Sequence, residues 1–480
     1  MKRILLLSLV LIMLFTGCSA PVAEISALGE NKAFFSQMKV NQNGLELDIV
    51  GQGDMQLNKA SNLSANSNVA NESQLALTDS SGNPIYKIVY PEKTIEIIHD
   101  AAEVLRVALK DATGKDFKKQ SDATPDSNSY EILIGTTNRA QSKQTLGEKE
   151  YLIKVDGKKV IIAGGGYYAT AVAVSRFKSC FSKESPFIEK NLLINGTLDP
   201  TYRVAVSNSG DTSIDIYDIT PFNTKAKLVK TFKDVGATGI NFRHTDKHGD
   251  VVVCATGTVV KVLNYSTGKV IWSKTGIAKS AHGAEILPNG VVAVASSTPN
   301  TVSFFDTSGS ASKTVTLEDA HAVLWDPKYQ VVWAAGYTEI RAYKVTLKNG
   351  ALTVTEDTSK RSPFNNTGAH DLAPVYYDED KMWVSTFGKV YIYDKTTKKF
   401  SENIPGNNGI MCVRRVKGLG NFVDGSMITT YPDEKSTSLY TWTTEKLNFY
   451  FMYEGKLYYS PVYTPGEHYY KVRIVCNDYQ

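Results

Sequence analysis

The sequence is poor in cysteine, and its cysteines are not spaced as metal ligands or as a disulfide framework. Only five of the 480 residues are cysteine, and no two of them form a Cys-x-x-Cys motif. Zinc sites and small disulfide-linked domains depend on closely spaced cysteines, so neither is indicated. The apolar run around Cys254 predicts a buried thiol, and we expect Cys412 and Cys476, which can be neighbours in the fold, to be free thiols.

An excess of charge of one sign is also absent, as are common catalytic motifs. The 53 lysines and arginines nearly balance the 49 aspartates and glutamates, which leaves a formal net charge of +4. Nucleic-acid-binding domains concentrate positive charge, so we expect no nucleic acid partner, and we expect a monomer. The chain contains no Gly-x-Ser-x-Gly motif, no His-Glu-x-x-His motif and no convincing pair of carboxylates.

Long apolar runs are missing except at the N-terminus. There, two basic residues precede an apolar stretch, residues 4–15, which is too short to span a bilayer as a helix and is typical of a signal peptide. The following Phe-Thr-Gly-Cys resembles the lipobox of bacterial lipoproteins, with Phe15 in place of the usual leucine. The resemblance implies removal of residues 1–17, acylation of Cys18, and anchoring to membrane lipid on the extracytoplasmic face of the cell membrane. The alternative is an ordinary secretory signal with a chance cysteine.

Two segments of different character follow the lipobox. Residues 18–82 are rich in Asn, Ser, Ala and Gln without an apolar period, which predicts a flexible spacer. Residues 83–198 combine strand and helix patterns and predict a small α/β domain of the α+β sandwich type. Within it, residues 98–109 have apolar side chains at helical spacing and predict a helix that ends at Gly114. Asp156-Gly157 is typical of a two-residue hairpin turn.

The order of these elements, with the phrases EILIGTTNR and IIAGGG, resembles the small α/β domain that precedes the catalytic barrel in α-glucuronidases and β-hexosaminidases. In those enzymes the domain is an accessory without catalytic residues, and no barrel follows here. The resemblance therefore implies a carbohydrate context and no chemistry. Gly164-Gly165-Gly166-Tyr167-Tyr168-Ala169 also fits the Gly-x-Gly-x-x-Ala dinucleotide fingerprint. Its preceding strand closes a hairpin, so we expect a tight strand-to-helix turn instead.

From residue 199 onward, short β-branched and aromatic strands recur between turn residues. Ala-His, a strand, a turn, an apolar strand and an aromatic strand follow in the same order from Ala281, Ala320 and Ala369. The three histidines are separated by 39 and 49 residues, close to the roughly 40–50 residues of a four-stranded propeller blade. The repeat predicts a β-propeller over residues 199–480.

The last strand pattern, HYYKVRIVC, predicts how the ring closes. Placed as the inner strand of the first blade, it removes the open sheet edges. The expected number of blades is six, or seven if residues 435–465 form more than one outer pair of strands. The region resembles an uncharacterised propeller family of secreted bacterial proteins, which has no settled activity. The expected fold is a small α/β domain followed by an all-β six-bladed β-propeller.

Alignment of the expected inner strands places four histidines in one column. From the second blade to the sixth and then the first, the column reads Thr238, His282, His321, His370, Gly409 and His468. Equivalent positions on inner strands converge at the channel mouth, so we predict that the four histidines are catalytic residues around one volume. Imidazoles suit proton transfer and metal coordination, and we predict that His282, His321 and His370 hold a divalent metal ion. The alternative is that each histidine bonds to the neighbouring blade and stabilises the ring.

A second column contains arginines. The segments that end in Arg243, Arg414 and Arg473 match one another as expected inner strands. Guanidinium groups bind carboxylate or sulfate in bidentate fashion, which suits uronic acids or sulfated sugars. The alternative is inter-blade salt bridges with acids such as Asp326. The C-terminal stretch is dense in aromatic residues, most of them expected in the core, and we add Tyr469 to the three arginines as a predicted substrate-binding residue.

Two further resemblances concern function. The three Ala-His blades are similar to those of oligogalacturonate lyases, which hold a metal ion with propeller histidines. AHGAEILPNG is similar to the His-x-x-x-Leu-Pro-Asn-Gly phrase of bacterial arylsulfate sulfotransferases, in which a histidine takes up the sulfuryl group. Together they imply a surface lipoprotein that acts on or binds an acidic glycan, as a lyase or hydrolase before a sulfotransferase if it is an enzyme. The alternative is a non-catalytic scaffold that binds glycan or protein.

Overall fold

The computed structural model describes the part of the chain that carries both predicted domains. The described residues are 39–41, 44–46, 71–126, 128–222, 225–236, 238–433 and 441–475. The expected signal peptide and Cys18 lie outside them, as does most of the spacer, where the short strands β1 (Lys39–Asn41) and β2 (Gly44–Glu46) pair. Among the described residues, no helix combines the length and the apolar character that a membrane span requires.

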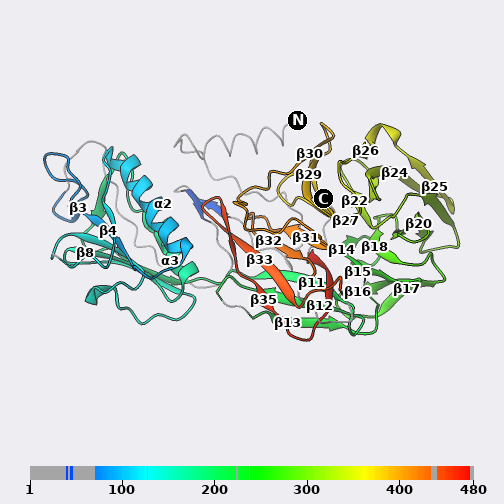
Figure 1. The fold of residues 1–480 in the computed structure, drawn as a ribbon, viewed down its shortest axis with the longest axis horizontal. Coiled ribbons are helices and arrows are strands. Elements are labelled where there is room, and N and C mark those ends of the chain that lie inside the picture. The colour runs from blue at the N-terminus through cyan, green and yellow to red at the C-terminus, as the bar shows by residue number, and fades with distance from the viewer. Residues whose placement is uncertain are drawn as a thin grey trace. The chain divides into compact units, whose positions relative to one another are not determined.

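The α/β part is built on a six-stranded sheet with the order β10-β7-β8-β6-β4-β5 (Figure 1). Its strands are β4 (Lys87–Tyr90), β5 (Lys119–Ser121), β6 (Glu131–Ile134), β7 (Glu150–Asp156), β8 (Lys159–Gly164) and β10 (Leu193–Thr197). Strands β5, β4, β6 and β8 are parallel neighbours, whereas β7 and β8 form the expected hairpin. The short strands β3 (Gln74–Ala76) and β9 (Phe187–Glu189) pair separately.

Two helices pack on each other in this part, α2 (Glu96–Thr113) and α3 (Tyr167–Lys178). Apolar residues of α2 recur every three or four positions and are buried. Gly114 ends α2 with a left-handed φ of 72° and donates its N–H to the carbonyl of Lys110, as the sequence predicts. A single 3-10 turn, Ala140–Ser142, lies between β6 and β7.

The second part is a propeller of six antiparallel sheets, the blades. Blade 1 consists of β36 (Tyr469–Ile474), β11 (Tyr202–Asn208), β12 (Ser213–Ile219) and β13 (Lys227–Phe232). Blade 2 consists of β14 (Gly239–Thr245), β15 (Gly249–Thr256), β16 (Val259–Asn264) and β17 (Val270–Thr275). Blade 3 consists of β18 (Ala281–Ile286), β19 (Val291–Ser296), β20 (Thr301–Asp306) and β21 (Ser312–Thr316). Blade 4 consists of β22 (Ala322–Asp326), β23 (Val331–Ala335), β24 (Glu339–Lys348), β25 (Ala351–Glu356) and the short β26 (Ser362–Pro363). A 3-10 turn at Thr358–Lys360 lies between β25 and β26. Blade 5 consists of β27 (Ala369–Pro374), β28 (Lys381–Thr386), β29 (Val390–Asp394) and β30 (Lys399–Ser401). Blade 6 consists of β31 (Gly418–Asn421), β32 (Met427–Thr430), β33 (Lys446–Tyr453), β34 (Lys456–Tyr459) and the short β35 (Val462–Tyr463).

The ring closes through the C-terminal strand. β36 pairs antiparallel with β11 and is the inner strand of blade 1, which confirms the predicted closure. The innermost strands contact one another in the cyclic order β36, β14, β18, β22, β27, β31, and most of them are labelled in Figure 1. In the described part of residues 435–465, the strands belong to blade 6, so the propeller has six blades.

One inner strand differs from the prediction. The segment that ends in Arg414 is not a strand, and the inner strand of blade 6 is β31, which begins at Gly418. The prediction was wrong because the Met-Cys-Val-Arg segment has the apolar character of a strand although it forms the loop that leads into blade 6. Its Met411 is buried beside Val416 in the core between blades 5 and 6, which explains the apolar character.

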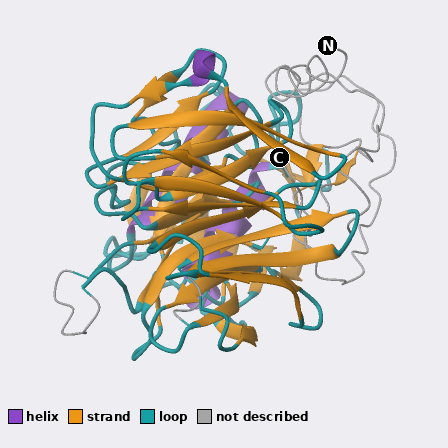
Figure 2. Cartoon of the chain, turned by 90° about the vertical axis from the view of Figure 1, so that its right-hand side faces the viewer, coloured by secondary structure: helices purple, strands orange, loops and turns teal. Residues whose placement is uncertain are grey.

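The core of the propeller lies between neighbouring blades. Every residue of β19 is buried because both faces of the sheet are covered, whereas the outermost strands β17 and β21 are mostly exposed. Phe304 of blade 3 and Trp325 of blade 4 belong to one such inter-blade cluster. Strands, drawn in orange, account for most of the chain that faces the viewer in Figure 2, and the few helices are purple. Cys254 is buried as predicted, and Cys180, Cys254 and Cys412 are free thiols, while Cys476 lies outside the described residues.

Candidate functional site

Three of the four predicted histidines lie together at one end of the inner strands. Two of them, His282 and His370, are directed there by β-bulges. The pairing of β18 with β19 shifts between Ala281 and Gly283, so His282 is the extra residue of a β-bulge. The pairing of β27 with β28 shifts in the same way around His370. His321 directly precedes β22 and donates its backbone N–H to the carbonyl of Ala335. A bulge redirects the side chain of its extra residue, which explains why an Ala-His pair recurs at the start of these strands.

The three imidazole rings form a contiguous row across blades 3, 4 and 5. The rings of His282 and His321 stack with centroids 4.5 Å apart and an angle of 22° between their planes. The ring of His370 meets that of His321 edge-on, with centroids 5.4 Å apart. All three rings are mostly buried, and 12% of the His321 side chain is exposed. This row matches the predicted convergence of His282, His321 and His370.

Two residues that the sequence reasoning did not select complete the cluster. Lys417, just before β31, places its Nζ 2.9 Å from Nε2 of His370, and Tyr470 on β36 places its hydroxyl 3.3 Å from Nδ1 of His282. Nζ of Lys417 also lies 5.9 Å from the centre of the Tyr470 ring. We call these five side chains the axial cluster: His282, His321, His370, Lys417 and Tyr470.

The hydrogen bonds of the axial cluster set the protonation of its imidazoles. Nδ1 of His321 lies 2.8 Å from the carbonyl oxygen of Asp319, so Nδ1 carries the proton and Nε2 has a lone pair. Nε2 of His370 accepts a hydrogen bond from the ammonium of Lys417, so the proton of His370 lies on Nδ1. That Nδ1 is buried and has no hydrogen-bond partner among the described residues. The cluster therefore offers both a lone pair and an unused N–H donor.

Burial keeps the imidazoles neutral. It lowers the pKa of His282 and of His370 to about 2, and neighbouring cations act in the same direction. Burial also lowers the pKa of His321, although hydrogen bonding to Asp319 opposes the shift. Positive charge in the cluster therefore resides on lysine and not on histidine at neutral pH. For Lys417, burial and then the nearby Arg415 lower the pKa to about 8, which leaves the ammonium the major form at pH 7.

A second layer of charged side chains lies immediately beyond the histidines. Lys471 is fully buried and donates to the carbonyl of His370 at 2.7 Å and to Oδ1 of Asp371 at 3.0 Å. The guanidinium of Arg473 donates to both carboxylate oxygens of the same Asp371, at 2.5 and 2.6 Å, and to the side-chain oxygen of Asn241 at 2.7 Å. Burial lowers the pKa of Lys471 to about 8, against the opposing effect of Asp371. One carboxylate, Asp371, therefore balances two cations in this layer.

The arginine column has a structural role at the two positions that are on inner strands. Arg473 of blade 1 reaches Asp371 of blade 5, and Arg243 of blade 2 donates to Glu285 of blade 3 at 2.6 Å. Both pairs are buried and join separate blades, so they correspond to the inter-blade salt bridges weighed as the alternative. Asp326 is not their partner, since it pairs with Lys395 at 2.7 Å.

Besides Arg243 and Arg473, three further predicted site residues lie apart from the axial cluster. Arg414 is exposed in the loop before β31, because that loop and not a strand occupies its segment. His468 comes two residues before Tyr470, the residue that reaches the axis, and it lies beside Gly210 and Asn208 of blade 1. Tyr469 is buried and its hydroxyl is 2.7 Å from that of Tyr217, which places it in the core and not on a ligand-binding surface.

The sequence contains signals for Lys417 and Tyr470, but they can be recognised only when the register of the inner strands is known. In the aligned column the position of His468 belongs to Tyr470, and that of Gly409 belongs to Lys417. The two errors differ in origin: at blade 6 the predicted inner strand, residues 411–414, is a loop, and on β36 the alignment of apolar patterns sets the column two residues too early. A lysine directly before β31, at the position that histidine holds in three other blades, is the signal that identifies Lys417.

The axial residues fit an anion better than a divalent cation. Among the described residues, no group of three or more His, Cys, Asp or Glu is arranged to hold a metal ion. The lone pair of Nε2 in His370 already accepts a hydrogen bond from an ammonium, and Lys417 and Lys471 both lie against the imidazole row. Two adjacent positive charges oppose a bound metal ion, whereas they attract a carboxylate or a sulfate.

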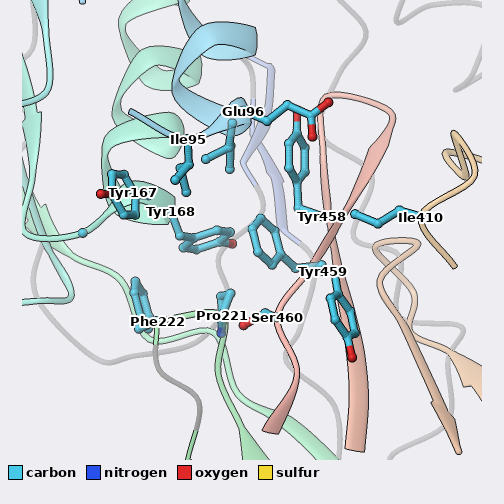
Figure 3. A pocket seen from close by; sticks show the side chains of 13 residues that line it. Ile95, Glu96, Tyr167, Tyr168, Pro221, Phe222, Ile410, Tyr458, Tyr459 and Ser460 are labelled. Atoms are coloured by element: carbon cyan, nitrogen blue, oxygen red, sulfur yellow. The ribbon is translucent and has the colours of Figure 1, made fainter. Parts of the chain in front are cut away.

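A second candidate site is a pocket of about 310 Å³. It lies in the compact unit that also contains the axial cluster and that comprises Ser67–Thr197 and Thr201–Gln480. Figure 3 shows that aromatic side chains line it, with Tyr168 near its centre. The Tyr168 ring lies 5.2 Å from Phe451 and 5.3 Å from Phe222. The described lining residues include no histidine, lysine or arginine, so this pocket does not match the acidic ligand that the sequence predicts.

The glycine-rich turn before α3 is explained by packing. A Cβ at Gly165 would lie 1.8 Å from the carbonyl oxygen of Gly147, and a Cβ at Gly164 would lie 2.3 Å from the backbone nitrogen of Thr170. Only glycine allows the backbone segments to approach this closely. The turn therefore agrees with the tight strand-to-helix connection predicted in place of a dinucleotide site.

Comparison with known proteins places the propeller in a family. Residues 200–461 match the model of DUF6528, a family of unknown function. The chain belongs to this family. The DUF6528 region contains all three clustered histidines and Lys417, but it ends before Lys471 on the closing strand.

Solved structures that are similar to the DUF6528 chain include one described as a functionally unknown protein from Desulfotomaculum acetoxidans DSM 771. The two are 14% identical, and the match covers 59% of this chain and 92% of that chain with a TM-score of 0.39. No curated protein matches the chain.

Proposed function

We propose that this DUF6528 propeller binds an acidic glycan at the axial cluster and does so at the outer surface of a cell membrane. The observation that carries the proposal is the position of Lys417, a mostly buried ammonium whose hydrogen-bond partner is the neutral imidazole of His370. A buried ammonium is usually paired with a carboxylate. Here a carboxylate or sulfate from a ligand can take that role and accept from Lys417.

The carbohydrate part of the proposal has separate support. The phrases EILIGTTNR and IIAGGG of the α/β domain resemble the accessory domain of glycan-cleaving enzymes. A uronic acid or a sulfated sugar supplies the anion that the lysines attract. Acylation of Cys18, which lies outside the described residues, would hold the propeller at the membrane surface with residues 18–82 as the spacer.

The proposal is tested by the affinity for matched acidic and neutral ligands. Isothermal titration calorimetry with hexagalacturonate, a sulfated galactan hexamer and a neutral galactan hexamer separates charge from sugar. We expect binding of one or both acidic hexamers and none of the neutral one, and their ratio distinguishes carboxylate from sulfate. Equal binding of the neutral hexamer, or binding of none, contradicts the proposal.

One observation favours a catalytic role as a second candidate. With its pKa lowered to about 8, Lys417 has a substantial neutral fraction just above neutral pH, as a general base requires. In an elimination from a uronate, neutral Lys417 would take the C5 proton, a C4–C5 double bond would form, the C4–O bond would break, and the ammonium of Lys417 would return the proton to the leaving oxygen. The unsaturated product absorbs in the ultraviolet. A steady increase in absorbance with hexagalacturonate that Lys417→Met abolishes supports this role, and binding without any product leaves the protein a binder.

A further inference from the structure

Three exposed aromatic side chains lie on equivalent loops of three consecutive blades. Tyr337 follows β23 of blade 4, Phe387 follows β28 of blade 5, and Trp442 precedes β33 of blade 6. Their exposed fractions are 41%, 56% and 44%, whereas the other tryptophans and most other phenylalanines of the described propeller are buried or half-buried. Exposed aromatic rings gathered in one region indicate a contact surface.

These loops open at the same end of the propeller as the axial cluster. The second strand of each blade runs antiparallel to the inner strand, so the end of the second strand adjoins the start of the inner one. The bond from the backbone N–H of His321 to the carbonyl of Ala335, next to the Tyr337 loop, shows this directly. The aromatic residues therefore surround the side of the axis on which His321, His370 and Lys417 lie.

A continuous series of hydrogen bonds joins the three loops to the segments that carry the axial residues. Tyr337 donates its N–H to Glu318, and its carbonyl accepts from Gly368, just before His370. Phe387 donates to Thr367 at 3.2 Å and accepts from the N–H of Arg415 at 2.8 Å, just before Lys417. The guanidinium of Arg415 reaches the carbonyl of Thr441, the neighbour of Trp442, at 3.4 Å. The aromatic side chains thus stand on a fixed frame.

Arg415 adds an exposed cation within this frame. It lies between Phe387 and Lys417, and its backbone has a left-handed φ of 58°. The equivalent loops of blades 1, 2 and 3, residues 209–212, 257–258 and 297–300, contain no aromatic residue. The combination of aromatic rings and a cation is therefore confined to blades 4, 5 and 6. We call Tyr337, Phe387, Arg415 and Trp442 the aromatic rim.

We propose that the aromatic rim forms subsites for the successive sugar rings of an acidic oligosaccharide whose central acidic group occupies the axial cluster. Sugar rings present C–H edges that pack on aromatic faces, and Arg415 can pair with an acidic group of a second sugar. An oligosaccharide with an acid on successive rings offers both the C–H edges and the repeated negative charges that this set of aromatic rings and cations can bind. The inference rests on the proposed function, because it extends the same site outward over blades 4 to 6.

The test compares ligand lengths on paired variants of the full chain. The ligands are galacturonate and hexagalacturonate, and the variants are Tyr337→Ala with Phe387→Ala against the single control Tyr377→Ala. Tyr377 is 42% exposed, close to the 41% of Tyr337, and it belongs to blade 5, but it follows β27 at the opposite end of the inner strand. Circular dichroism of each variant checks that the propeller is intact.

The wild type is expected to bind the hexamer at least tenfold more tightly than the monomer. The double variant should lose most of that advantage while its affinity for galacturonate stays unchanged, and the control should keep it. If the wild type binds the hexamer no more tightly than the monomer, or if Tyr377→Ala loses as much affinity for the hexamer as the double variant, the proposed subsites on the aromatic rim are wrong and the proposed function is unaffected. Binding of neither ligand by the wild type overturns the proposed function, and the rim with it.

Discussion

Lys417 and His370 are hydrogen bonded at 2.9 Å although they are 47 residues apart and belong to adjacent blades. The bond joins the loop before β31 to a bulge in β27, and it turns the ammonium toward the axis. It also gives the site its character, because the imidazole stays neutral and the lysine carries the charge.

Replacement of Lys417 by methionine should weaken binding of an acidic ligand. The variant keeps the length of the side chain and loses the ammonium, and a hydrogen bond to a charged group contributes about 2 kcal/mol, which corresponds to roughly thirtyfold in affinity. Calorimetric titration with hexagalacturonate measures the loss. The control Lys313→Met removes an exposed lysine on the outermost strand of blade 3 and should bind as the wild type does. Equal affinities of the two variants would exclude Lys417 from the site.

The affinity for an acidic ligand should fall as the pH rises through about 8. Lys417 and Lys471 have pKa values of about 8, so both are mostly protonated below that pH and lose their charge above it. Between pH 5 and 7 the affinity should be nearly constant, because the pKa values of His282 and His370 are about 2 and these rings stay neutral. Titrations at pH 5.5, 7, 8 and 9 test both statements. A steep fall between pH 5.5 and 7 would instead indicate titrating histidines.

Loss of Arg473 should destabilise the propeller strongly. Arg473→Met leaves the buried Asp371 with Lys471 as its remaining ion-pair partner, and breaking a buried pair on one side costs about 3–5 kcal/mol. The matched control is Arg203→Met, which breaks the partly exposed pair with Asp218 and should cost less than about 1 kcal/mol. Urea unfolding curves give both values. Similar costs for the two variants would mean that the Asp371 pair does not hold the ring closed.

Treatment with a chelator should leave ligand binding unchanged. The lysines beside the histidine row disfavour a divalent ion, so we expect less than one equivalent of metal per chain by elemental analysis of the purified protein. One equivalent that is present in the wild type and lost in His321→Ala would restore the metal site predicted for His282, His321 and His370.

Substitution of Cys18 by serine should release the protein from the membrane. The thiol is the acceptor of the acyl chains that the lipobox resemblance implies, and each buried methylene contributes about 0.8 kcal/mol to anchoring. Fractionation of cells that express the wild type and the Cys18→Ser variant, with labelled palmitate, measures both anchoring and acylation. Membrane association of the unlabelled variant at the wild-type level would show that the anchor lies elsewhere.

The sequence alone determined the elements whose signals are local. The period of the Ala-His repeats identified the propeller, the apolar spacing that ends at Gly114 identified α2, and the final strand pattern identified β36 as the closing strand. Each of these depends on neighbours within one blade or one helix, where the pattern of side chains follows directly from the backbone period.

Only the tertiary structure decided which side chains share the axis. His468 and Arg414 have the right residue types, yet Tyr470 and Lys417 hold the positions that face His282 and His370. The pairing of β36 with β11 and the start of β31 at Gly418 set which residues of blades 1 and 6 reach the axis, and the bulges in β18 and β27 turn His282 and His370 toward it. The partner of β36 lies about 270 residues away, so the local strand pattern shows that β36 closes the ring but not which of its residues reaches the axis.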